Sequence, residues 1–280
     1  MANSLKRLTD DVVNSWSVMP RSQALRWYAS ILTHLPTILR ERKFYSADRE
    51  MSGVATFYAF GKTVNLNLDE MNSSAGNPYA FLRELFVRQV YFRGFKTLKF
   101  DTCLDLGCNA GVVSALLKEL AGPTGRVVGV DATSFCDSAF RRNKNSVPGL
   151  TLLHAVLCSH AMIEDPAALH ALCARFDFDP SLATTVEDLM DAHALQHVDF
   201  VKMDIEGAEF PILRDSVRWL DRVDNLAMEV HNAEGDPSEI IHLIGQSGFR
   251  VKWLDDYGYP APDQRSAGYL YASKTGSLKD

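Results

Sequence analysis

The sequence predicts an α/β protein with a Rossmann-like, doubly wound and mostly parallel sheet of seven strands, preceded by an N-terminal extension of helices and a hairpin. Two observations predict this fold. After residue 100, short runs rich in valine, leucine and isoleucine alternate with helical stretches, and most of these runs lack the period-two alternation of a half-solvated strand. A glycine-containing turn also follows the first run and opens a helix, as in nucleotide-binding sheets. We therefore assign the sheet to residues 101–280 and treat residues 1–100 as an extension that caps the active site.

The N-terminal extension is expected to be mainly helical. Apolar side chains recur at helical spacing from Ser22, the expected N-cap, to Thr37. Pro36 is expected to end or bend that helix because proline has no backbone N–H to donate. Residues 55–68 are typical of two short strands joined by a tight turn, and residues 78–91 are expected to return to helix.

The elements of the expected sheet follow in order along the chain. The strands share a short, apolar composition and cover residues 102–106, 126–130, 150–157, 199–205 and 225–230. The helices expected between them cover residues 111–121, 136–143, 166–176 and 208–220. Two later apolar runs, 249–254 and 268–273, are expected to extend one edge and complete the seven strands.

The amino-acid composition disfavours some classes of binding partner. The formal charge of −6 and the scattered basic residues disfavour a nucleic-acid binder, which would need a basic surface. The five cysteines form no C-x-x-C pair, so no zinc site is predicted and a reduced compartment is expected. The N-terminus shows no signal-peptide pattern, and the apolar stretches are too short for a membrane span. We therefore expect a soluble, cytoplasmic protein.

The first motif with chemical meaning is DLGCNAG, residues 105–111, between the first strand and its helix. Gly107 and Gly111 let a ligand approach the backbone closely. Their G-x-x-x-G spacing differs from the G-x-G-x-x-G that seats a dinucleotide pyrophosphate. Asp105 suits a cofactor with an amino group, such as the methionine part of S-adenosylmethionine. The candidate cofactor-binding residues are thus Asp105, Gly107, Asn109 and Gly111; a simple strand-to-helix turn capped by Asn109 is the alternative.

A second acidic position follows at the end of the next strand, in VVGVD, residues 127–131. Asp131 comes about 20 residues after the glycine turn, where a carboxylate accepts hydrogen bonds from ribose hydroxyls. The alternative is an exposed aspartate that caps a helix starting near residue 134. The neighbouring Ala132 and, in the third strand, Val156 are further candidates for cofactor contact. Together with the glycine turn, Asp131 indicates a nucleoside-type cofactor.

The most specific motif is VDFVKMDIEGAE, residues 198–209. Lys202 lies inside an apolar strand and is expected to pair with a neighbouring acid, because a buried charge is costly without a partner. Asp204 ends the fourth strand and is predicted to lie in the site, and Glu206 lies in the following loop. Glu209 enters the next helix, where the helix dipole alone accounts for a carboxylate.

A histidine ends the fifth strand in LAMEVH, residues 226–231. His231 would lie beside the end of the fourth strand, and a neutral imidazole suits a general base near neutral pH. A histidine with only a structural role is the alternative. Glu229, inside the same strand, is a candidate partner for Lys202. The predicted catalytic residues are His231, Asp204 and Glu206, with Asp204 also helping to hold the cofactor.

These segments together resemble the FkbM family of S-adenosylmethionine-dependent methyltransferases over residues 103–254. VKMDIEGAE, residues 201–209, is the closest match, and RNKN at 142–145 and TVEDL at 185–189 are similar to further family segments. Asp131 and Ala132 stand where the family often has Glu-Pro, so an acid for the ribose is retained. The resemblance implies S-adenosylmethionine as cofactor and methylation of a hydroxyl on a sugar or natural product.

A mechanism follows from this resemblance. His231 would take the proton of the acceptor hydroxyl, Asp204 would hold cofactor or acceptor, and Glu206 would contact the acceptor. A Mg²⁺ ion that bridges Asp204 and Glu206 to two acceptor oxygens is a variant left open.

Two other functions also stay open. One is a non-catalytic methyltransferase-like subunit, and the other is a nicotinamide-dependent oxidoreductase, which the missing G-x-G-x-x-G disfavours.

Overall fold

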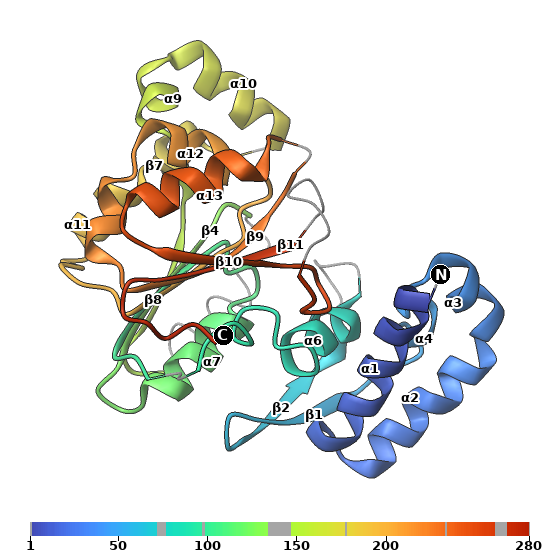
Figure 1. Ribbon diagram of the computed structural model, residues 1–280. Coiled ribbons are helices and arrows are strands. Elements are labelled where there is room, and N and C mark those ends of the chain that lie inside the picture. Colours follow the sequence, from blue (N-terminus) through green and yellow to red (C-terminus); the bar gives the residue numbers. More distant parts are fainter. Residues whose placement is uncertain are drawn as a thin grey trace. The chain divides into compact units, whose positions relative to one another are not determined.

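The computed structural model describes residues 2–71, 77–96, 99–133, 147–176, 178–232, 234–260 and 268–279. The chain divides into two compact units, Met1–Arg93 and Gly94–Asp280 (Figure 1). The boundary expected at residue 100 falls inside the second unit. Within the described residues, no helix has the length and apolar character needed to cross a bilayer.

The first unit consists of helices and one hairpin. Its elements are α1 (Ala2–Val18), α2 (Arg21–Thr33), α3 (Leu35–Glu41), α4 (Tyr45–Asp48), β1 (Val54–Ala59), β2 (Lys62–Asn67), α5 (Leu68–Met71) and α6 (Pro78–Phe86). The predicted hairpin is confirmed, with β1 and β2 antiparallel. Its two turn residues, Phe60 and Gly61, both have positive φ, 55° and 72°, as a tight hairpin turn requires.

Two details of the first unit differ from the prediction. The N-cap of α2 is Pro20 and not Ser22. The helix ends at Thr33, and Pro36 lies in the first turn of α3, where the missing N–H removes no helical hydrogen bond. The core of this unit also contains charges: the guanidinium of Arg83 lies 2.6 Å from Asp11 and 2.9 Å from Asp48. No pattern in the sequence indicates this buried network.

The second unit contains the sheet. Its elements are β3 (Thr102–Leu106), α7 (Val112–Ala121), β4 (Arg126–Asp131), β5 (Leu150–His154), β6 (Val156–Leu157), α9 (His160–Glu164), α10 (Pro166–Phe176), η1 (Pro180–Leu182), β7 (Ala183–Thr184), α11 (Val186–Ala192), β8 (Phe200–Met203), α12 (Glu209–Asp215), η2 (Arg218–Arg222), β9 (Asn225–Val230), α13 (Pro237–Gln246), β10 (Arg250–Leu254) and β11 (Gly268–Ser273).

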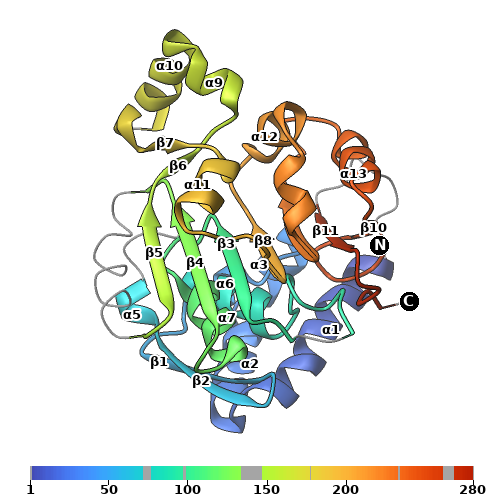
Figure 2. The same cartoon turned by 90° about the vertical axis from the view of Figure 1, so that its left-hand side faces the viewer.

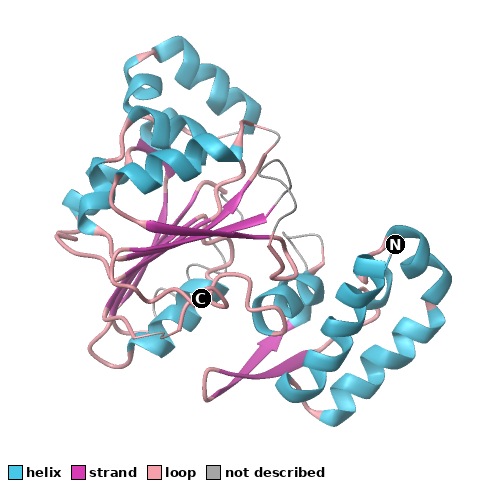
Figure 3. Cartoon of the chain, in the orientation of Figure 1, coloured by secondary structure: helices cyan, strands magenta, loops and turns pink. Residues whose placement is uncertain are grey.

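The predicted seven-stranded, mostly parallel sheet is confirmed. Its strand order is β10-β11-β9-β8-β3-β4-β5, and Figure 2 shows the strands from β5 to β8 side by side. All neighbours from β9 to β5 are parallel, whereas β11 is antiparallel to both β9 and β10. Helix α7 covers one face of the sheet, and α12 and α13 cover the other (Figure 3). The strand order reverses at β3, which places the switch point between β3 and β8.

Two predicted elements are each divided in the structure, and a third lies outside the described residues. The strand expected at 150–157 divides into β5 and the short β6, which pairs with β7 in a separate sheet. Val156 therefore lies beside the seven-stranded sheet and not at the end of its third strand. The helix expected at 208–220 divides into α12 and η2. The helix expected at 136–143 and the RNKN segment at 142–145 lie outside the described residues.

Candidate functional site

The glycine turn after β3 is joined to the ends of both neighbouring strands. Gly107 has φ 79°, and a β-carbon there would lie 1.6 Å from the backbone oxygen of Asp204 at the end of β8. Asn109 also has positive φ, 47°, and its N–H donates to Oδ2 of Asp131 over 2.6 Å. Gly111, with φ 76°, is the N-cap of α7. Only glycine fits at position 107, since the backbones of two strand ends meet there.

Asp131 ends β4 as a partly buried carboxylate. Its Oδ2 accepts the hydrogen bond from Asn109, and its Oδ1 accepts the N–H of Thr133 over 2.9 Å. The next residue, Ala132, uses its carbonyl oxygen to contact Nε2 of His154 at 3.2 Å. These bonds hold the carboxylate at the edge of the sheet next to the glycine turn. The helix that Asp131 would cap in the alternative interpretation lies outside the described residues.

Lys202 and Asp105 form a buried pair between β8 and β3. The two residues are directly opposite in the parallel register, and their side chains are 3% and 0% exposed. The ammonium of Lys202 lies 3.3 Å from Oδ1 of Asp105 and 3.6 Å from Oδ2 of Asp204, and it donates to the carbonyl of Gly107. Ser114 donates to Oδ2 of Asp105 over 2.6 Å. Thus Lys202 has an acidic partner, as predicted.

Burial and the neighbouring charges shift the pKa values of this pair in opposite directions. Burial lowers the pKa of Lys202, but Asp105 and Asp204 overcome that effect and raise its pKa above the usual value. Burial also raises the pKa of Asp105, and the nearby ammonium only partly offsets this. The acids beside Lys202 are thus Asp105 and Asp204, whereas Glu229, the candidate partner named from the sequence, accepts a hydrogen bond from the hydroxyl of Tyr269 on β11 over 2.9 Å.

His231 is held from behind by Glu209, whose side chain is 0% exposed. Oε1 of Glu209 accepts the backbone N–H of His231 at 2.7 Å and lies 3.0 Å from its Nδ1. Oε2 accepts the backbone N–H of Gly207 over 2.8 Å. Glu209 does begin α12, but these contacts show that it does more than complement the helix dipole.

The three predicted catalytic residues lie together. Nε2 of His231 is 3.4 Å from Oε2 of Glu206 and 3.9 Å from Oδ1 of Asp204. Glu206 has φ 54° and a side chain that is 83% exposed, so it lies on the open side of the cluster. One electrostatic expectation is corrected. Burial works to lower the pKa of His231, but Glu209, followed by Asp204 and Glu229, raises it to about 9. The imidazole is therefore protonated near neutral pH.

A second cluster of one histidine and two acids lies at the opposite edge of the sheet and was not predicted. Nδ1 of His197 is 3.6 Å from Asp199, and its Nε2 is 3.2 Å from Asp224. Asp199 precedes β8 and accepts the backbone N–H groups of Asp101 and Thr102 over 2.9 and 2.8 Å. Asp224 precedes β9. Asp199 lies in the motif at residues 198–209, but the proximity of the three side chains depends on the pairing of the strands, which no motif marks.

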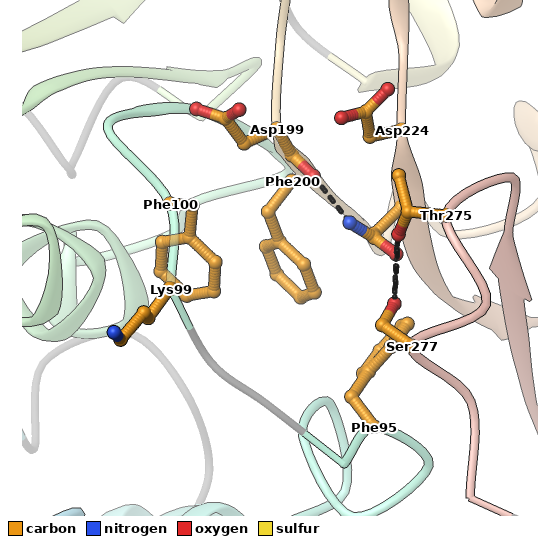
Figure 4. Close-up of a pocket in the computed structure, with 9 residues that line it drawn as sticks. Phe95, Lys99, Phe100, Asp199, Phe200, Asp224, Thr275 and Ser277 are labelled. Atoms are coloured by element: carbon orange, nitrogen blue, oxygen red, sulfur yellow. Dashed lines mark hydrogen bonds between the residues drawn. The ribbon is translucent and has the colours of Figure 1, made fainter.

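A cavity of about 150 Å³ adjoins this second cluster (Figure 4). The rings of Phe100 and Phe200, which stack on each other with centroids 5.0 Å apart, line it on one side. On its other side, Asn225 donates to the carbonyl of Asp199 and accepts hydrogen bonds from Thr275 and Ser277. Its polar groups are thus largely bonded to one another.

Part of the chain matches a known protein family. Residues 181–259 match a family model described as the Methyltransferase FkbM domain, and this range contains β8, Glu209 and His231. No curated protein matches the chain.

Solved structures with a similar chain include three methyltransferase-fold proteins. An FkbM methyltransferase from Methylobacillus flagellatus KT is 15% identical with a TM-score of 0.45, covering 88% of this chain and 60% of that one. A SAM-dependent methyltransferase from Aquifex aeolicus is 17% identical with a TM-score of 0.34, covering 64% and 90%. Fibrillarin from Aeropyrum pernix, in complex with natively bound S-adenosyl-L-methionine, is 15% identical with a TM-score of 0.40, covering 79% and 94%.

Proposed function

We propose that this chain, an FkbM-family methyltransferase by the match of residues 181–259, uses S-adenosylmethionine to methylate a hydroxyl oxygen of a small molecule or sugar. One observation carries the proposal. The left-handed glycine turn, the carboxylate of Asp131 and the cluster around His231 all follow the carboxyl ends of adjacent parallel strands, where ligands bind in open α/β sheets.

The carboxyl edge of the sheet has the chemistry that this cofactor requires. The backbone of residues 107–111 would lie along its methionine part, and the partly buried Asp131 would accept its ribose hydroxyls. Asp204 would contribute negative charge near the positive sulfonium. The bound cofactor supplies an electrophilic methyl group. Asp105 is engaged with Lys202 and Ser114 inside the sheet, so its own contact with the cofactor stays a prediction, as do those of Ala132 and Val156.

The residues around His231 would perform the remaining tasks. Orientation of the acceptor oxygen with water excluded can supply about 7–11 kcal/mol of the barrier. Glu206, exposed and 3.4 Å from Nε2, would contact the acceptor as it enters. The acceptor proton would pass to Nε2 of His231, which must first be deprotonated because its pKa is raised to about 9.

Participation of Mg²⁺ stays a separate prediction. Atoms of Asp204, Glu206 and His231 lie within 4.8 Å of one another, a spacing compatible with one divalent cation. An imidazolium has no free lone pair on Nε2, so a cation would have to compete with a proton there. Methyl transfer measured after dialysis against EDTA, with and without added Mg²⁺, tests this variant: full activity in EDTA would contradict it.

Calorimetric titration with S-adenosylmethionine and S-adenosylhomocysteine tests the proposed cofactor. We expect dissociation constants on the order of micromolar to millimolar. Asp131→Ala should weaken binding by about 10- to 100-fold, because a hydrogen bond to a charged group is lost. Asp224→Ala, which removes a carboxylate from the opposite edge, serves as the matched control and should bind normally. Folded wild-type protein that binds neither compound would contradict the proposal.

Two further assays separate the alternatives. Binding of S-adenosylmethionine without methyl transfer to any of a panel of hydroxylated acceptors would favour the non-catalytic subunit. A fluorescence titration with NADH tests the oxidoreductase, for which we expect no binding because the G-x-G-x-x-G spacing is missing.

A further inference from the structure

Glu209 is a fully buried carboxylate to which the proposed reaction assigns no role. Isolation of such a charge from water costs several kcal/mol unless it is paired. Among the described residues, the ion pair recorded for Glu209 is the one with His231, at 3.0 Å. The two backbone N–H groups that it accepts, from Gly207 and His231, join the loop after β8 to the end of β9. Its position thus depends on the same two strands that carry the catalytic cluster.

The contact with Nδ1 determines which nitrogen of the ring is available. A carboxylate accepts a hydrogen and donates none, so Nδ1 must carry a proton when it faces Oε1 of Glu209. In the neutral ring, the lone pair is then on Nε2, which faces Glu206 and Asp204. This is the open side of the cluster, where an acceptor can reach the ring.

We propose that Glu209 is a positioning residue for methyl transfer, which holds His231 through Nδ1 so that Nε2 takes the proton of the acceptor hydroxyl. This inference rests on the proposed function. The O–H bond of the acceptor breaks and its proton moves to Nε2. The oxygen electron pair forms the new bond to the methyl carbon, and the electrons of the broken S–C bond stay on sulfur. Glu209 then stabilises the imidazolium, which later releases its proton to water.

Other charged groups also face the ring. Asp204 and Glu206 approach from the loop after β8, and Glu229 lies on β9, bonded to Tyr269 of β11. Glu209 differs from these acids because it is both buried and hydrogen-bonded to the ring. Its effect on the imidazole should therefore exceed theirs.

Glu209→Gln tests the inference by two measurements. The first is an NMR titration of the His231 ring nitrogens in the cofactor-free protein, which reports tautomer and pKa without any turnover. We expect a protonated Nδ1 in the neutral wild-type ring and a pKa near 9, falling toward 6.5 in Glu209→Gln. The second is the pH profile of kcat, which should shift in the same direction, while the limiting kcat at high pH, where the ring is neutral in both proteins, falls by about 100-fold or more.

Two variants control for structural effects. Glu239→Gln removes another first-turn glutamate, which is exposed and paired with Arg214 over 2.7 Å, and it should change neither measurement. Glu209→Asp keeps the charge, so it should retain part of the raised pKa even if Glu209→Gln folds poorly.

The outcomes separate this inference from the function on which it rests. If the wild-type enzyme is active and Glu209→Gln leaves the pKa and the tautomer of His231 unchanged, the positioning role alone is overturned. Wild-type protein that methylates no acceptor, whatever the pKa of His231, would overturn the proposed function and the positioning role together.

Discussion

The two edges of the central sheet carry similar sets of side chains on the same pair of strands. At the carboxyl ends of β8 and β9 lie Asp204, Glu206 and His231, and at the amino ends lie His197, Asp199 and Asp224. Each set offers one imidazole and two carboxylates with atoms within 4.8 Å of one another. We nevertheless assign chemistry to only one of them.

The difference lies in what surrounds each histidine. The ring of His197 is 57% exposed, and its neighbour Asp199 is occupied with two backbone N–H groups at the start of β3. His231 is 25% exposed and is backed by the buried Glu209. The loop that holds Glu206 beside it contains two consecutive residues with positive φ, Glu206 at 54° and Gly207 at 101°. Residue types alone therefore do not mark a site; the sheet edge and the buried acid behind the imidazole distinguish the two clusters.

The largest effect is expected from Gly107→Ala at the carboxyl edge. The new β-carbon would meet the backbone oxygen of Asp204 at 1.6 Å, so β3 and β8 must separate. We expect a loss of about 3 kcal/mol or more in the free energy of unfolding, measured with urea, and no detectable cofactor binding. Gly276→Ala is the control, since Gly276 has φ 75° but open space around it, and it should cost only about 1–2 kcal/mol. Equal losses would contradict the close approach.

Substitution of the two histidines tests the comparison directly. His231→Ala should lower kcat by about 10²- to 10⁴-fold, because the proton acceptor is lost, and should leave cofactor affinity almost unchanged. His197→Ala should leave kcat at the wild-type value. Steady-state kinetics with calorimetry for the cofactor measures both effects. Unchanged turnover in His231→Ala would remove this residue from the mechanism.

The pH dependence follows from the raised pKa of His231, about 9. If the neutral ring is the base, turnover should rise with pH up to about 9, since only about 1% of the rings are neutral at pH 7. The contribution of His231 to the free energy of unfolding depends on pH in the opposite sense. It is fully present below the unfolded pKa of about 6.5 and is lost as pH rises through about 9. Thermal unfolding between pH 6 and 10 should therefore show a decline that His231→Ala lacks.

The smallest effect is expected from Asp199→Ala at the amino edge. Loss of its carboxylate leaves the N–H groups of Asp101 and Thr102 without this acceptor. We expect a loss of about 1–2 kcal/mol in the free energy of unfolding and no change in kcat. A large drop in kcat with normal stability would show that the two edges are not as different as we infer.

Much of the sheet could be predicted from the sequence because its strands are short apolar runs bounded by polar residues. The predicted bounds of β3, β9, β11 and α10 coincide with the observed ones. The candidate site could be predicted for the same reason: residues directly after parallel strands meet at one edge. Contacts between strands could not be predicted. The partner of Lys202 depends on the register that sets it opposite Asp105, and local sequence does not contain that register.

Burial was the other property that the sequence left open. Glu209 at the start of a helix is compatible with an exposed, dipole-stabilising role, and only the packed structure shows it to be 0% exposed. The pKa of His231, raised to about 9, follows from its hydrogen bond with Glu209 and from the charges of Glu209, Asp204 and Glu229. Likewise, the ion pairs of Arg83 with Asp11 and Asp48 in the first unit join residues that are distant in sequence.

The antiparallel strand β11 also has a consequence for how the protein is made. It lies between β9 and β10, pairs with β9 from Asn225 to Val230, and places Tyr269 against Glu229 beside His231. During synthesis, β9 lacks this neighbour until residues 268–273 have left the ribosome. Domains generally fold as units, so β9, which directly precedes the candidate base His231, is completed only after residues 268–273 are made. Until then β9 is an open sheet edge, which is a site where nascent chains can pair wrongly or bind chaperones.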